Sequence, residues 1–117
     1  MRLKKLRKSF LYAWRGIRTV AREEQNFRIQ LIAACLVFVA AAMVQVRPTD
    51  AAILVLVTAL VLVLELTNSV VERMLDALKP RIHPFVGDVK NIAAGAVMIA
   101  AVGAIIVALF VFYPYVA

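Results

Sequence analysis

The stretch that decides the fold is AAILVLVTALVLVLELTNSVVERMLDALKP, residues 51–80. It is apolar from Ala51 to Leu64 with a single threonine, and it then carries acids among apolar residues as far as Asp76. A helix needs about 20 predominantly apolar residues to cross a bilayer, and the apolar residues keep recurring after the acids begin. We therefore expect one helix over residues 51–78 that spans a membrane and extends beyond it.

The acids of this helix form a stripe that begins at Glu65. At about 100° per residue, Asn68, Glu72 and Asp76 all lie within about 60° of it. Three carboxylates repel one another unless a cation binds between them, and Arg73 points about 100° away from Glu72. Mg²⁺ prefers oxygen ligands and is usually held by one or two carboxylates together with substrate phosphates. The stripe therefore predicts a metal–nucleotide site.

The composition of the whole chain also indicates a membrane protein. Of its 117 residues, 64% are hydrophobic and 18% are charged, whereas a soluble domain holds about 45–50% apolar residues. A chain this short buries only some two-thirds of its surface against itself. A soluble globular enzyme is therefore excluded, and the surplus apolar surface must face lipid or other copies of the chain.

Two further membrane spans flank the first stretch, at residues 29–46 and 88–113. The first ends at the Arg47-Pro48 turn, where proline cannot continue a hydrogen-bonded helix, and Asp50 is expected to cap the next helix. Small side chains let membrane helices approach closely. The last span is rich in them, at Ala93, Ala94, Gly95, Ala96, Ala100, Ala101, Gly103 and Ala104. We expect a single all-α integral membrane domain over residues 1–117.

The amino-terminal 28 residues hold nine of the fourteen cations in a chain of net charge +7. Apolar residues recur among them at helical spacing, which predicts an amphipathic surface helix over residues 1–28, with Trp14 at the interface and the cations on anionic lipid. Packing on a soluble partner is the alternative. Nucleic-acid binding would leave the apolar remainder unexplained.

The distribution of cations orients the three spans. The amino terminus and the 79–90 loop carry the basic residues, whereas the 47–50 turn and the uncharged tail lie on the opposite side. The positive-inside rule assigns the basic side to the cytoplasm. We therefore expect a multi-pass protein of the plasma or inner membrane with a cytoplasmic amino terminus.

Further polar residues fall at the level of the acid stripe. The Glu23-Glu24 pair adds acids, Lys90 is a point charge suited to polyphosphate, and Gly87 is a position where backbone can approach a ligand. The acid pair, Lys90 and the nearby His83 also have ordinary interpretations. The acid pair fits as partners of nearby arginines, Lys90 as a marker of the cytoplasmic side, and His83 as a loop residue.

Five short motifs follow one another along the chain in a characteristic order. They are Ala13-Trp14-Arg15-Gly16, Glu24-Gln25-Asn26-Phe27-Arg28, Glu65-Leu66-Thr67-Asn68-Ser69-Val70-Val71-Glu72 with Asp76, His83-Pro84, and Lys90-Asn91-Ile92-Ala93-Ala94-Gly95. Together they resemble the prokaryotic diacylglycerol kinase and undecaprenol kinase family over nearly the whole chain. The resemblance implies a homotrimeric helical bundle of three-span protomers, each with a surface helix, and active sites shared between neighbours.

The resemblance also implies roles for individual residues. Glu65 becomes the base that accepts the lipid hydroxyl proton, with Asn68 as its polar neighbour, and Glu24 and Glu72 become the Mg²⁺ ligands. The expected nucleotide contacts are Lys90, Asp76, Gly87, His83, Tyr12 and Asn91. The expected lipid contacts are Trp14, Arg28 and Ser69.

One position departs from the family pattern, because Asn91 stands where the family usually has aspartate. Asparagine keeps the shape but loses a charge and a pure acceptor. Reduced activity is therefore expected.

The predicted function is transfer of the γ-phosphate of Mg-ATP to the hydroxyl of diacylglycerol or undecaprenol, which yields phosphatidic acid or undecaprenyl phosphate. No G-x-x-x-x-G-K-[ST] loop occurs, so carboxylate-bound metal and lysine must hold the nucleotide. The alternative is a non-enzymatic or inactive membrane protein, a transport or assembly subunit, because proton paths also use intramembrane carboxylates.

Overall fold

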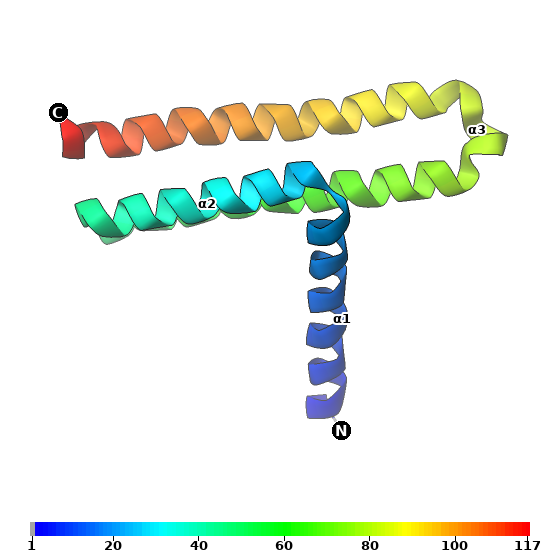
Figure 1. The fold of residues 1–117 in the computed structure, drawn as a ribbon, viewed down its shortest axis with the longest axis horizontal. Helices are drawn as coiled ribbons and strands as arrows, with labels where there is room; N and C mark the ends of the chain where they lie inside the picture. Colours follow the sequence, from blue (N-terminus) through cyan, green and yellow to red (C-terminus); the bar gives the residue numbers. More distant parts are fainter. Residues whose placement is uncertain (1) are drawn as a thin grey trace.

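The computed structural model describes residues 2–117, apart from the side chains of residues 79–83. Within this part of the chain there are three helices, α1 (Arg2–Glu23), α2 (Gln25–Val44) and α3 (Pro48–Val116). In Figure 1, α3 runs beside α2, reverses direction and returns along the bundle, while α1 projects away from it. The all-α prediction is confirmed.

Three segments of these helices are long and apolar enough to cross a membrane. They are Gln25–Val44, Pro48–Leu78 and Pro84–Val116. Each begins a few residues before the start expected from the sequence. Pro48 explains one of these differences, because proline is well accommodated in the first helical turn, where its missing N–H has no partner to lose.

The expected cap at Asp50 is wrong. Arg47 is the N-cap of α3, and Asp50 lies in the first turn, where a carboxylate meets the positive end of the helix. There it accepts a hydrogen bond from the Tyr115 hydroxyl at 2.5 Å, while the Arg47 backbone N–H donates to the same hydroxyl at 2.9 Å. The carboxyl-terminal tail and the α2–α3 turn therefore lie at the same end of the bundle.

The expected loop over residues 79–90 is also corrected. The backbone stays helical through this segment, including Gly87, while the ribbon reverses direction (Figure 1). The sequence has prolines at positions 80 and 84 of this segment, and proline removes a backbone N–H donor from a helix. Helical backbone takes the place of the expected loop.

The packed core of the bundle is small. Ala41, Leu54 and Val111 join α2 to both halves of α3, whereas large apolar side chains such as Leu36 and Ile99 are mostly exposed. Contiguous exposed apolar surface of this kind needs lipid or another protein against it. The core therefore fixes the helices in place but does not cover their outer faces.

Candidate active site

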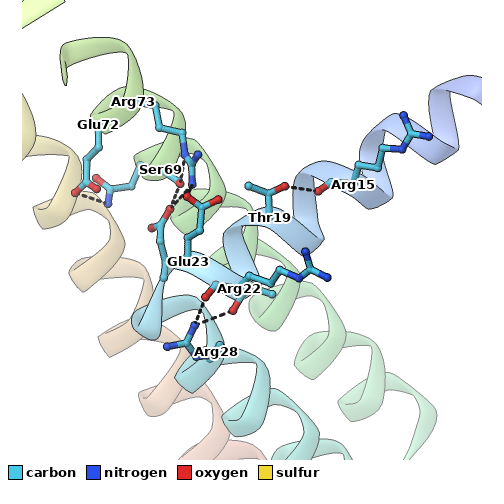
Figure 2. A network of polar contacts seen from close by, with 11 residues as sticks. Arg15, Thr19, Arg22, Glu23, Arg28, Ser69, Glu72 and Arg73 are labelled. Carbon is cyan, nitrogen blue, oxygen red and sulfur yellow. Dashed lines mark hydrogen bonds and ion pairs between the residues drawn. The ribbon is translucent and has the colours of Figure 1, made fainter. Parts of the chain in front are cut away.

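The junction between α1 and α2 lies against α3 near Ser69 and Arg73. Glu24 links the two helices in an extended conformation, with φ −120° and ψ 117°. The Arg28 side chain turns back toward the carboxyl-terminal end of α1. There it donates to the backbone carbonyls of Ala21 at 3.0 Å and Arg22 at 2.8 Å (Figure 2). A cation is favoured at a helix carboxyl terminus, so Arg28 stabilises the angle between α1 and α2.

This junction holds a polar pocket of about 250 Å³. It is lined by Glu24, Gln25, Asn26, Glu65, Asn68 and Glu72. Glu65 and Glu72 of the acid stripe therefore share this pocket with Glu24, whereas Asp76 does not line it. The pocket brings together four of the predicted site residues. They are the expected metal ligands Glu24 and Glu72, together with Glu65 and Asn68.

Glu65 is only 3% exposed although it lies within a membrane-spanning segment. Its Oε2 accepts a hydrogen bond of 3.5 Å from Gln30 Nε2 on α2. Sequence reasoning missed Gln30, although an amide inside an apolar span is itself a signal of a polar site. Asn68, the expected neighbour of Glu65, instead donates from Nδ2 to Glu72 at 3.4 Å.

Two buried oxygen atoms near this pocket have no hydrogen-bond partner among the described residues, Gln30 Oε1 and Asn68 Oδ1. Leaving a buried acceptor unsatisfied costs about 1–3 kcal/mol. Native proteins retain such atoms mainly where a ligand, an ion or a water satisfies them. Both oxygens belong to residues that contact the pocket acids, which supports ligand binding there.

Glu24 is held from α3 by two side chains (Figure 2). Ser69 Oγ donates to Glu24 Oε2, and Arg73 Nη2 lies 3.5 Å from the same oxygen. Arg73 also reaches Glu23 at 3.7 Å. The arginine that pairs with the Glu23-Glu24 acids is therefore Arg73 of α3, not the nearby Arg22 or Arg28 of the ordinary interpretation. Arg73 does point away from the stripe, but its long side chain reaches the acids of the α1–α2 junction.

The described side chains do not form a metal centre by themselves. Among the described side chains, no cluster of three or more histidine, cysteine or acidic residues is close enough to hold an ion. Mg²⁺ does not require one, because it usually takes one or two carboxylates and keeps waters or substrate phosphates. The Glu24 and Glu72 carboxylates in one pocket, with the unpartnered Asn68 Oδ1 beside them, fit that donor set.

A second charged site joins the two halves of α3. Lys90 Nζ lies 2.8 Å from Asp76 Oδ1, and both side chains are partly exposed. These two predicted nucleotide contacts are thus brought together. Gly87 has open space where a Cβ would lie, so the protein's own packing does not require glycine there.

Three of the remaining predicted contacts lie on the surface, outside the polar pocket. Asn91 is exposed, and Tyr12 and Trp14 are 63% and 61% exposed on α1. His83 lies outside the described side chains. Asn91, Tyr12 and Trp14 do not line the polar pocket, so their roles stay predictions.

An apolar groove of about 190 Å³ lies between α2 and the two halves of α3. Its lining is Gln30, Ala33, Ala34, Val37, Leu54, Val57, Thr58, Val61, Leu62, Ala101, Ala104, Ile105 and Ala108. Gln30 contacts Glu65, which lines the polar pocket, so the apolar groove and the polar pocket adjoin at that hydrogen bond. An amphiphilic molecule fits this arrangement, with its apolar part in the groove and its polar group in the polar pocket.

Comparison with known proteins identifies relatives of this chain. The family model described as prokaryotic diacylglycerol kinase matches residues 11–112. The undecaprenol kinase of Bacillus subtilis is 36% identical over 107 residues, which cover 92% of this chain and 87% of that protein.

Two diacylglycerol kinases are also similar to the chain. That of Synechocystis is 36% identical over 100 residues, which cover 85% of this chain and 57% of that protein. That of Escherichia coli K12 is 30% identical over 95 residues, which cover 81% of this chain and 78% of that protein. These findings confirm the resemblance and the enzyme class, a phosphotransferase with an alcohol acceptor. With its three apolar spans and the buried acid Glu65, the chain belongs to the prokaryotic diacylglycerol kinase family of membrane lipid kinases.

Proposed function

We propose that this protein transfers the γ-phosphate of Mg-ATP to the hydroxyl of a membrane lipid alcohol, diacylglycerol or undecaprenol. The observation that carries the proposal is the position of Glu65, a buried carboxylate where the polar pocket meets the apolar groove. A lipid alcohol whose chain lies in the groove would present its hydroxyl to that carboxylate. A water-soluble substrate would have no use for the groove.

The chemistry then follows from the residues at this boundary. The lipid oxygen attacks the γ-phosphorus, the bond from that phosphorus to the β–γ bridging oxygen breaks, and ADP leaves. Glu65 accepts the hydroxyl proton, and Gln30 Nε2 orients the carboxylate by donating to it. The unpartnered Gln30 Oε1 is an acceptor for a hydroxyl or a water at the same place. Positioning and charge neutralisation supply most of the catalysis in phosphoryl transfer.

Glu24 and Glu72 are the residues proposed to hold Mg²⁺. When bound, the ion would offset charge on the ATP phosphates. Lys90 would leave its ion pair with Asp76 and bind a nucleotide phosphate instead, which adds positive charge there. Asp76 would remain near the bound nucleotide. We propose further nucleotide contacts from Gly87, His83, Tyr12 and Asn91. Trp14, Arg28 and Ser69 are proposed to lie near the lipid.

The non-enzymatic alternative receives no support from the relatives, all of which are named as kinases. ADP release in the presence of undecaprenol or diacylglycerol separates the two functions. Release that depends on one of these alcohols supports the kinase. Release that no lipid alcohol stimulates would count against it.

Removing either proposed metal ligand is expected to weaken the response to Mg²⁺. Glu24→Gln and Glu72→Gln each delete one metal-binding charge with almost no change in volume. We expect the Mg²⁺ concentration for half-maximal activity to rise about tenfold or more, as metal-site substitutions commonly cost that much. Titration of activity against Mg²⁺ measures this. An unchanged midpoint in both variants would remove these residues from the metal site.

We also propose that the active protein is a homotrimer, with α1 on the membrane surface and with the amino terminus and residues 79–90 in the cytoplasm. Shielding of Glu65 does not require the trimer, because one chain already buries this acid. The support comes from the last span. A Cβ added at Gly95 or Gly103 would meet nothing within 4 Å, so this small-residue face is open for close helix packing.

The oligomeric state can be measured directly. The mass of the detergent-solubilised protein, after the detergent belt is subtracted, is expected to equal three chains. Replacing Gly103 with leucine is expected to lower that mass, because the larger side chain separates the packed helices. A monomeric wild-type protein would rule out shared active sites.

A further inference from the structure

Arg73 lies between two neighbouring acids of the α1–α2 junction (Figure 2). Its Nη2 is 3.5 Å from Glu24 Oε2 and 3.7 Å from Glu23 Oε1, and its Nε donates to Ser69 Oγ at 3.4 Å. Glu24 is the less exposed of the two acids, with 22% of its side chain accessible against 57% for Glu23. The guanidinium therefore has one partner that lines the polar pocket, Glu24, and one that does not, Glu23.

The inner partner is a residue for which the arginine and a metal ion would compete. Glu24 lines the polar pocket and is one of the two carboxylates proposed to hold the divalent cation. Both observed donors, Ser69 and Arg73, use the same oxygen of Glu24. A guanidinium at this distance neutralises the carboxylate and repels an incoming dication. Occupation of Glu24 by Arg73 thus opposes metal binding.

We propose that Arg73 competes with the divalent cation for Glu24, and that Glu23 holds the guanidinium when the cation takes Glu24. The inference rests on the proposed metal site. Arg73 is a positioning residue that acts through Glu24 and touches neither phosphate nor lipid. Ser69 donates to Glu24 in this structure, and the proposal keeps that bond when the cation binds, so that the carboxylate keeps its orientation.

The exchange is easily reversible because the ion pairs are partly exposed. The Arg73 side chain is 46% accessible, and exposed pairs of this kind contribute little free energy. The arginine therefore moderates metal affinity without blocking the site. From that weak coupling we expect the dissociation constant for metal to fall about three- to fivefold in Arg73→Gln.

The test uses Mn²⁺ in place of Mg²⁺, with the full-length protein and a non-hydrolysable ATP analogue. Free Mn²⁺ is measured by electron paramagnetic resonance, so no turnover is needed. Arg22→Gln is the matched control, because it removes the same charge from the same junction without an ion pair to Glu24. We expect Arg22→Gln to stay within about twofold of wild type and Arg73→Gln to bind Mn²⁺ about three- to fivefold more tightly.

Glu23→Gln supplies an independent second variant. It removes the outer partner and confines Arg73 to Glu24, so Mn²⁺ binding is expected to weaken. In the Arg73→Gln background the same change is expected to have a smaller effect, because the guanidinium is gone. This non-additivity distinguishes competition from a general loss of acidic charge.

The outcomes separate the inference from the proposed function on which it rests. Suppose that Glu24→Gln loses Mn²⁺ binding while Arg73→Gln binds Mn²⁺ no more tightly than the wild type. That result would overturn the competition and leave the metal site in place. Additive effects of Glu23→Gln and Arg73→Gln would also overturn it. Absence of Mn²⁺ binding in the wild type would overturn both proposals.

Discussion

Glu65→Gln is expected to lower lipid phosphorylation by about two to four orders of magnitude, the range typical of a lost general base. Glutamine has nearly the same volume, and it can still accept a hydrogen bond from Gln30 through its carbonyl oxygen. It cannot take the hydroxyl proton at neutral pH. The loss should therefore fall on the turnover number, with little change in the concentration of ATP or Mg²⁺ required.

Asp88→Asn is the matched control for this variant, because it removes one exposed acid from α3 outside the polar pocket. We expect it to keep wild-type turnover. Initial rates at saturating ATP, Mg²⁺ and lipid alcohol measure both variants, and the mass in detergent shows whether each assembles normally. Glu65→Gln with wild-type turnover would exclude Glu65 as the base.

Asn91→Asp is the second change with a large expected effect, and it should raise turnover about ten- to a hundredfold. The sequence resemblance implies an acid beside Lys90, and Lys90 is paired with Asp76 at 2.8 Å. A charge-assisted contact of about 1.5–3 kcal/mol, if it is made in the transition state, corresponds to that gain in rate. The substitution is nearly isosteric, so trimer mass should not change.

The measurement compares both proteins side by side with undecaprenol and with diacylglycerol as acceptors. Asn91→Leu serves as a control that removes polarity without adding charge, and it is expected to be no faster than the present protein. Equal turnover of Asn91→Asp and the wild type would show that the acid is dispensable here.

Regular features along the chain were predictable from the sequence because they depend on local spacing. Three apolar stretches required three membrane helices, and the spacing from Glu65 to Glu72 placed the acids on one face. The proximity of Glu24 to that face followed from its position at the level of the stripe. Each of these inferences used only helix periodicity and the thickness of a bilayer.

Contacts that depend on side-chain reach across the fold were not predictable in this way. Helical angle correctly separates Arg73 from the acid stripe, yet its extended side chain meets Glu24, which lies 49 positions earlier. Gln30 and Glu65 are likewise 35 positions apart and meet only because α2 packs on α3. Periodicity fixes the direction in which a side chain leaves its own helix, whereas its partner depends on how two helices pack.

The central claim is tested most directly by following the γ-phosphate of ATP into lipid. Purified protein in vesicles is given labelled ATP, Mg²⁺ and either undecaprenol or diacylglycerol, and the label is counted in the extracted lipid. We predict label in the lipid fraction that requires both the lipid alcohol and Mg²⁺ and that Glu65→Gln reduces at least a hundredfold. Label that appears only as inorganic phosphate, with none in lipid for either alcohol, would contradict the account.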